Sequence, residues 1–181
     1  MKRPDNLKLG LRGIHHLAIS VPSLERAKVF YLEVLGFTLA DQISFGPDKQ
    51  SDQVLELKEA QCASMLVNAG NIFLEIFEFD ANETLRDDRR RLSEYGYTHF
   101  ALDVEDIQVA YQYLADAGVT WHHHPVDTGD GYWMAYGRDP FGNVIEIQQL
   151  ADGSGYGLDS LDGLDGLDGL NSLDSLNGVT L

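Results

Sequence analysis

Two stretches of the sequence, GIHHLAISVPSLERAKVFY (13–31) and GYTHFALDVEDIQVAYQYL (96–114), align without gaps and decide the fold. Each begins with residues that alternate between apolar and polar, which is typical of a strand with one buried face. A polar turn and an amphipathic pattern follow, so each copy predicts a strand that leads into a helix. Four residue types recur in register, in the pairs Gly13 and Gly96, His16 and His99, Ala18 and Ala101, and Val21 and Val104.

The two copies also match near their ends, where NIFLEI (71–76) lies over GNVIEI (142–147) and RDPFGN (138–143) supplies the preceding turn. The intervening residues give helix stops and strand patterns at LGFTL (35–39), SMLVNAG (64–70), AGVTW (117–121) and YWMAYG (132–137). Each copy therefore predicts the order βαβββ. We expect an α+β fold in which two such modules form a partly closed mixed β-barrel with outer helices.

We expect one domain over residues 1–150, with module one at 13–80, a linker with a helical portion at 81–95 and module two at 96–150. From residue 151 the sequence changes to a repeat of Leu, then Asp or Asn, then Gly or Ser. A period of three fits neither helix nor strand, so residues 151–181 are predicted to be a flexible acidic tail. The alternative is a docking segment whose leucines bind a partner or the protein's own surface.

The formal net charge of −16 argues against binding to nucleic acid or to an anionic membrane, and favours metal ions or small molecules as partners. Cys62 is the only cysteine, which excludes an internal disulfide and is compatible with a reducing compartment. The first residues are basic but contain no apolar segment typical of a secretory signal, so we expect a cytoplasmic location.

Strand alternation places one histidine and one glutamate of each copy on the face away from the helices. His16 and Glu75 in the first copy correspond to His99 and Glu146 in the second. His15 matches Thr98 and is expected on the opposite face, without a role at this site. Two imidazoles and two carboxylates that face one interior indicate a divalent-metal site, because an unpaired buried carboxylate is costly. The alternative is four polar residues on partly exposed sheet faces.

With HHLAISV (15–21), THFALDV (98–104) and DPFGNVIEI (139–147), the paired modules resemble the vicinal oxygen chelate superfamily over roughly residues 13–150. This superfamily contains glyoxalase I, epimerases, extradiol dioxygenases and fosfomycin-resistance proteins. The glyoxalase I pattern maps its metal ligands onto His16, Glu75, His99 and Glu146. Dioxygenases and fosfomycin-resistance proteins need only three of these, and the epimerase pattern more often has Gln at position 75.

The resemblance therefore implies a glyoxalase I-like lyase or isomerase, with one divalent ion (Zn, Ni, Co, Mn or Fe) and a small oxygen-chelating substrate. It implies an enediolate stabilised by the ion and a carboxylate base, for which Glu146 is the first candidate and Glu75 the second. A homodimer is expected, and the site could form within one chain or between two. Candidate substrate contacts are Phe73, Phe77, His123, Trp133, Tyr136 and Arg138.

Three alternatives remain open from the sequence. They are a non-haem iron extradiol-type dioxygenase, an epimerase, and a ligand-binding or resistance protein without turnover. The sequence shows no clear basic cluster for the carboxylates of glutathione, which argues for another substrate. The histidines of WHHHP (121–125) are expected in a loop at the barrel mouth, because consecutive strand residues cannot all face one ion.

Overall fold

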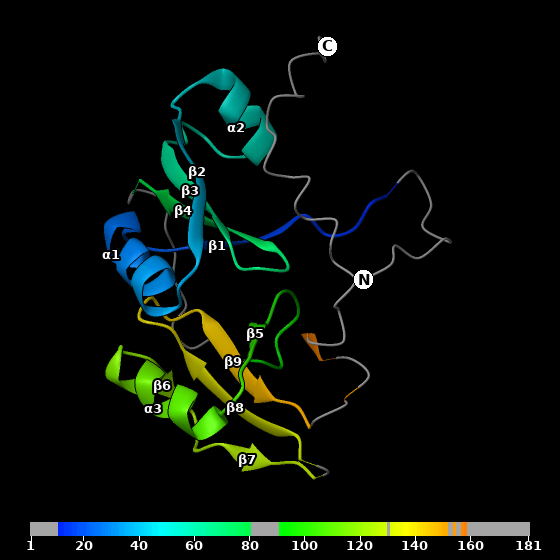
Figure 1. Ribbon diagram of the computed structural model, residues 1–181. Helices are drawn as coiled ribbons and strands as arrows, with labels where there is room; N and C mark the ends of the chain where they lie inside the picture. The colour runs from blue at the N-terminus through cyan, green and yellow to red at the C-terminus, as the bar shows by residue number, and fades with distance from the viewer. Residues whose placement is uncertain (1–10, 81–90, 130, 152–153, 155–156, 159–181) are drawn as a thin grey trace.

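The computed structural model describes residues 11–80, 91–129, 131–151, 154 and 157–158 (Figure 1). The first copy of the repeat builds a four-stranded sheet in the order β1-β4-β3-β2. Its strands are β1 (His16–Ser20), β2 (Thr38–Phe45), β3 (Cys62–Asn68) and β4 (Phe73–Phe79). β1 and β4 run parallel, whereas the β2–β3 and β3–β4 pairs are antiparallel.

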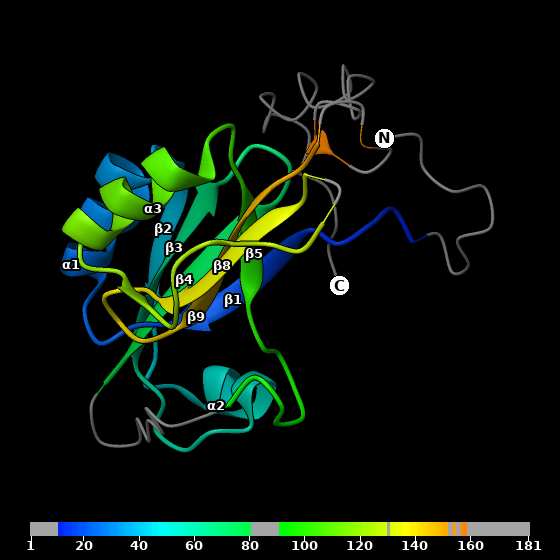
Figure 2. The ribbon, with the colours of Figure 1, turned by 90° about the horizontal axis from the view of Figure 1, so that it is seen from below.

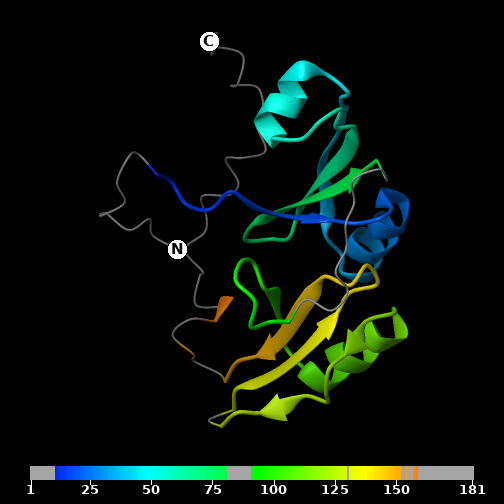
Figure 3. The same cartoon turned by 180° about the vertical axis from the view of Figure 1, so that it is seen from behind.

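The second copy builds a sheet in the corresponding order β5-β9-β8-β6, with β7 also paired to β8. Its strands are β5 (Phe100–Asp103), β6 (Thr120–Trp121), β7 (Val126–Asp127), β8 (Trp133–Arg138) and β9 (Val144–Gln149). β5 and β9 are parallel, as β1 and β4 are in the first sheet. The α+β fold is confirmed as two mixed sheets, and Figure 3 shows that they do not close into a full barrel.

Helices α1 (Leu24–Lys28) and α3 (Ile107–Asp116) follow the first strand of each copy, as the amphipathic patterns predict. α1 continues as a π-helical segment, η1 (Val29–Val34). Figure 2 shows α1 and α3 side by side, and the Tyr113 hydroxyl donates to the carbonyl of Val34 at 3.3 Å. The two helices therefore cover the same side of the molecule, which leaves the opposite sheet faces for a site.

The repeat extends to the hydrogen bonds that begin each helix. The N–H of Leu24 donates to Glu78 Oε2 at 2.7 Å, and the N–H of Ile107 donates to Gln149 Oε1 at 3.0 Å. Glu78 and Gln149 hold equivalent positions at the ends of β4 and β9. Each module thus uses a polar side chain of its last strand to satisfy the first free N–H of its helix.

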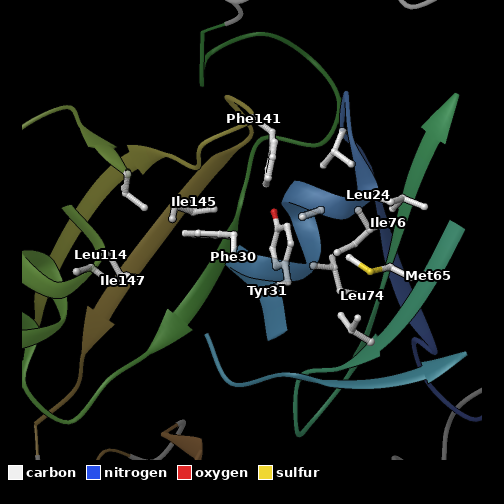
Figure 4. Close-up of a cluster of buried hydrophobic side chains, with 14 of the residues drawn as sticks. Leu24, Phe30, Tyr31, Met65, Leu74, Ile76, Leu114, Phe141, Ile145 and Ile147 are labelled. Carbon is white, nitrogen blue, oxygen red and sulfur yellow. The ribbon is translucent and has the colours of Figure 1, made fainter. Parts of the chain in front are cut away.

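The hydrophobic core lies between the helices and the two sheets (Figure 4). Phe30 and Tyr31 of η1 are buried among residues of both modules, including Ile76 and Ile145. The Tyr31 hydroxyl donates to Asp139 Oδ2 at 2.6 Å in the turn before β9. This buried bond ties the helix of the first module to the turn of the second.

Several segments differ from the sequence prediction or lie outside the residues that the structure describes. Helix α2 (Lys49–Leu55) was not predicted; Asp48 caps it by accepting from the N–H groups of Gln50 and Ser51. Of the predicted linker, 81–90 lies outside the described residues, and 91–95 contains a turn but no helix. Most of the predicted tail also lies outside the described part. Across that part, no helix is long and apolar enough to cross a membrane.

Candidate functional site

The first half of the candidate site lies on β1 and β4. Leu17 and Ile19 of β1 pack against the core, so His16 lies on the opposite face, as alternation predicts. Glu75 occupies the neighbouring strand opposite Ala18, on the same face as His16. His16 Nε2 lies 3.4 Å from Glu75 Oε2, and their side chains are 43% and 22% exposed. An imidazole nitrogen and a carboxylate oxygen therefore face each other at the surface of the first sheet.

The second half repeats this arrangement beside β5 and β9, in a more buried setting. His99 Nε2 lies 3.0 Å from Glu146 Oε2, and the Glu146 side chain is 6% exposed. Among the described residues, the other carboxylate oxygen, Glu146 Oε1, has no hydrogen-bond partner although it is buried. A buried carboxylate oxygen without a donor is costly unless a cation or a ligand supplies its partner.

Tyr136 completes the surroundings of the second pair. It lies opposite Glu146 in the β8–β9 ladder, and its ring centre is 5.0 Å from that of His99 in an edge-to-face arrangement. Burial, and then the Glu146 carboxylate, raise the pKa of Tyr136 to about 12. At neutral pH, Tyr136 is therefore a protonated phenol that can donate a hydrogen bond beside Glu146.

A cavity of about 510 Å³ is lined by residues of both modules, among them His16 and His99. Its walls include residues 16–19 of β1 and residues 97–100, which lead into β5. Two guanidinium groups, Arg91 and Arg138, and the amide of Asn143 also line it. This volume suits a small molecule, and the lining offers donors for carboxylate, hydroxyl or carbonyl oxygens.

The predicted substrate contacts fall into three groups. Tyr136 lies opposite Glu146 of the second pair, whereas Arg138 lines the cavity and donates to the carbonyl of Gly142 at 2.8 Å. Phe73 and Phe77 share the sheet face of Glu75, opposite His16 and Ser20, but do not line the cavity.

Trp133 and His123 lie elsewhere. Trp133, the first residue of β8, packs against the hydrophobic core, so its ring serves packing. His123 sits between β6 and β7, away from the cavity lining, and its Nδ1 contacts the carbonyl oxygen of His124 at 3.0 Å. Neither position brings the side chain to the His–Glu pairs.

The prediction for His15 needs a correction. β1 begins at His16, so strand alternation does not extend back to His15. Its ring stacks on Phe73, with centres 5.1 Å apart, and its Nδ1 lies 2.9 Å from His16 Nδ1. His15 therefore contacts the candidate ligand instead of pointing to the opposite face.

The donor atoms suit a divalent metal ion, although they occur as two separate pairs. Two ligand atoms each about 2.1 Å from one ion are roughly 3.0 to 3.4 Å apart at octahedral or tetrahedral angles. The separations within the pairs, 3.0 and 3.4 Å, match this range, and Glu146 Oε1 needs a partner. Across the described ranges, however, no three His, Cys, Asp or Glu side chains gather into one cluster.

The sequence analysis missed three polar residues that line the cavity, and one of them also contacts a candidate ligand. They are Arg91, Thr98 and Asn143. Asn143 ends the RDPFGN turn and Thr98 directly precedes the repeated His99. Their positions next to these two motifs could have identified them as site residues. Arg91 lies in the predicted linker, where no pattern marked it.

The sequence is similar to a described protein family and to individual proteins. The family model described as the Glyoxalase/Bleomycin resistance protein/Dioxygenase superfamily matches residues 13–147. A protein of Actinomyces sp. named 2-epi-5-epi-valiolone epimerase is 30% identical over 159 residues, which cover 80% of this chain and 83% of that protein. The uncharacterized protein YaeR of Escherichia coli K12 is 28% identical, over 78% of this chain and 98% of its own.

Solved structures share the fold. A glyoxalase family protein from Bacillus cereus superposes with a TM-score of 0.69 at 23% identity, over 78% of this chain and 96% of that one. A glyoxalase family protein from Enterococcus faecalis gives 0.57 at 24% identity, over 76% and 97%. The match to the Bacillus structure spans nearly its whole length, which agrees with the two-module architecture.

Proposed function

Because this chain belongs to the Glyoxalase/Bleomycin resistance protein/Dioxygenase superfamily, we propose that it is a metal-dependent isomerase or lyase that transfers a proton next to a carbonyl group. The observation that carries the proposal is the pair of His–Glu contacts at equivalent places in the repeat. One of their carboxylates, Glu146, is buried with an oxygen that lacks a partner among the described residues. Such a donor set supports both cation binding and proton transfer.

In this proposal His16, Glu75, His99 and Glu146 hold one divalent ion. When bound, the ion supplies Lewis-acid stabilisation of the negative charge that develops on a substrate oxygen. The residues themselves contribute two neutral imidazole nitrogens and two carboxylates, the ligand types that zinc and its neighbours in the first transition row accept. The 510 Å³ cavity beside the histidines would hold the substrate.

Glu146 is proposed as the base. Its Oε1 has no hydrogen-bond partner in the described part of the chain and can take a proton from a carbon atom, and the low exposure of the side chain keeps water from competing for that oxygen. The Tyr136 phenol, which faces the same carboxylate, is placed to donate a hydrogen bond to Glu146 after it returns the proton. Return of the proton from Glu146 to the adjacent carbon completes the reaction of an isomerase or lyase.

Epimerisation is a second candidate outcome of the same chemistry. The relative that is 30% identical is named an epimerase, and an epimerase must remove a proton from one face of a carbon and deliver one to the other. Two carboxylates on different sheets, Glu75 and Glu146, could serve opposite faces of one substrate. The guanidinium groups of Arg91 and Arg138 in the cavity lining favour a substrate rich in oxygen atoms.

The experiment measures metal content and proton exchange on the full chain. Elemental analysis of wild-type protein should find one divalent ion, which is lost in His16→Ala and Glu75→Ala. In D₂O, the loaded protein should exchange a carbon-bound proton of 2-epi-5-epi-valiolone or of the glutathione adduct of methylglyoxal. Protein that stays metal-free after reconstitution would refute the proposal. Oxygen consumption with a catechol, without proton exchange, would instead favour the dioxygenase reading.

A further inference from the structure

The residue before each candidate histidine ligand contacts that ligand's other ring nitrogen. His15 Nδ1 lies 2.9 Å from His16 Nδ1, and Thr98 Oγ1 lies 2.8 Å from His99 Nδ1. In both cases the far nitrogen, Nε2, faces a glutamate. The arrangement is thus repeated in two modules that use different side chains for the same contact.

This contact depends on how the chain enters the strand. Within a strand, neighbouring side chains point to opposite faces and cannot bond in this way. β1 begins at His16 and β5 begins after His99, so His15 and Thr98 both precede the regular extended region. Three residues before each histidine, Gly13 and Gly96 have φ values of 151° and 114°, in the region that favours glycine. The sequences GIHH and GYTH therefore each place a positive-φ glycine three residues before the histidine.

We propose that His15 and Thr98 are positioning residues that hold the proton of each ligand histidine on Nδ1 and leave the Nε2 lone pair for a metal ion. A neutral imidazole has one N–H donor and one acceptor nitrogen, so fixing the proton on Nδ1 decides which atom can ligate. The Thr98 hydroxyl accepts from His99 Nδ1. His15 accepts from His16 Nδ1 through its own Nδ1, which requires the His15 proton to be on Nε2.

The two positioning residues differ in how they are themselves held. The His15 ring is stacked on Phe73, with an interplanar angle of 25°, and meets the His16 ring edge-on at 89°. This stack fixes the plane of the acceptor. The Thr98 hydroxyl has lone pairs that accept from His99 Nδ1 while its own proton points elsewhere, so the second module obtains the same contact without an aromatic support.

The inference rests on the proposed metal site. It predicts that substitutions at His15 and Thr98, which do not touch the ion, lower the affinity for the metal. Replacing the hydrogen-bond partner of a ligand histidine typically weakens metal binding 10- to 100-fold. We therefore expect Thr98→Val, which keeps the shape but removes the hydroxyl, to weaken zinc binding by about that factor. Thr98→Ser keeps the hydroxyl and should stay within about threefold of wild type. His15→Phe keeps a ring on Phe73 but lacks the acceptor, and should behave like Thr98→Val.

The test uses the full-length protein, zinc and a competing chromophoric chelator to measure affinity. NMR of zinc-loaded, ¹⁵N-labelled protein adds a readout that does not involve activity. The Nδ1–H resonance of His99 should be protected from exchange in wild type and in Thr98→Ser, and lost in Thr98→Val. The His16 resonance should be unaffected in Thr98→Val and lost in His15→Phe.

The outcomes separate the two proposals. If wild-type protein binds zinc and Thr98→Val and His15→Phe bind it equally well, the positioning role is wrong while the metal site stands. If wild-type protein binds no zinc after reconstitution, the proposed function fails and this inference fails with it. A loss in Thr98→Val that Thr98→Ser does not rescue would point to local misfolding and contradict the hydroxyl's role.

Discussion

At the scale of single residues, the two candidate carboxylates are not equivalent. Glu146 is the more buried and has an oxygen with no donor in the part of the chain that is described, whereas Glu75 is partly exposed. General bases contribute about 10²- to 10⁴-fold to a rate. We expect Glu146→Gln to slow substrate proton exchange by at least about 100-fold, and Glu75→Gln by less than about 10-fold. Deuterium incorporation by NMR measures both, and a reversed order would make Glu75 the base.

The lone cysteine supplies a prediction with a defined pH dependence. Cys62 is buried, and burial, followed by the Glu75 carboxylate, raises the pKa of its thiol to about 11. Because an unfolded thiol ionises near pH 8.5, the folded protein should hold roughly 200-fold less thiolate at pH 8. Iodoacetamide should therefore label Cys62 slowly when the protein is folded and quickly in denaturant, with Cys62→Ser as the unlabelled control.

The same pKa has a consequence for stability. The folded state favours the protonated thiol, so this contribution is complete below the unfolded pKa and is lost as the pH rises from about 8.5 to about 11. Chemical denaturation of wild type and Cys62→Ser over this range measures it. The stability of wild type should fall with pH relative to the variant, and parallel curves would contradict the assignment.

At the scale of elements, alternation and repetition predicted most of the site, because both depend on local geometry. The alternation of side chains along a strand predicts that Leu17 and Ile19 face the core. The alignment of the two copies predicts that His16 corresponds to His99. The face predicted for His15 was wrong, because alternation holds only within the strand and β1 starts one residue later. The cavity wall was also missed in part, because Arg91 comes from a segment without a periodic pattern.

The bond between η1 and the turn before β9 could not be predicted either, since Tyr31 and Asp139 are distant in sequence. Asp139 accepts from the Tyr31 hydroxyl and from the backbone N–H groups of Phe141 and Asn143. Burial first, and then the Asp139 carboxylate, raise the pKa of Tyr31 well above its ordinary value, so it stays a phenol. Tyr31→Phe should lower the free energy of unfolding by about 1.5 to 3 kcal/mol, the range for hydrogen bonds to charged groups.

Denaturant unfolding checks this value. Tyr113→Phe is a matched control, because the exposed Tyr113 hydroxyl makes a longer, 3.3 Å bond to the carbonyl of Val34. Its loss should cost less than about 0.5 kcal/mol. Equal effects of the two variants would show that the Tyr31–Asp139 bond does not tie the modules together.

At the scale of the whole molecule, the sequence predicts that residues 152–181 are separate from the site. A truncated chain ending at residue 151 should bind zinc as tightly as the full chain, and its melting temperature should change by less than about 2 °C. Calorimetry and chelator competition measure these quantities. A weaker affinity would support the alternative, in which the leucines of this segment bind the protein's own surface.

The last prediction concerns how the two halves of the site meet. Both histidines line one cavity, yet over the described residues of one chain the four predicted ligands remain two pairs. In a homodimer with two-fold symmetry, any contact between two surfaces of the copies occurs twice, so we predict that His16–Glu75 of one copy meets His99–Glu146 of a second. His16→Ala and His99→Ala should then each lack a complete site. After unfolding and refolding of an equal mixture, half of the dimers are mixed and each mixed dimer has one intact site.

Zinc capacity, measured by equilibrium dialysis, should therefore recover to about a quarter of the wild-type value through random pairing of the two copies. Each variant refolded alone provides the baseline, and light scattering verifies the dimer mass. A mixture that recovers no zinc while remaining dimeric would place both pairs at one ion within a single chain. That result would leave the ligands and the proposed reaction unchanged, and would require the edges of β1 and β5 to approach each other when the ion binds.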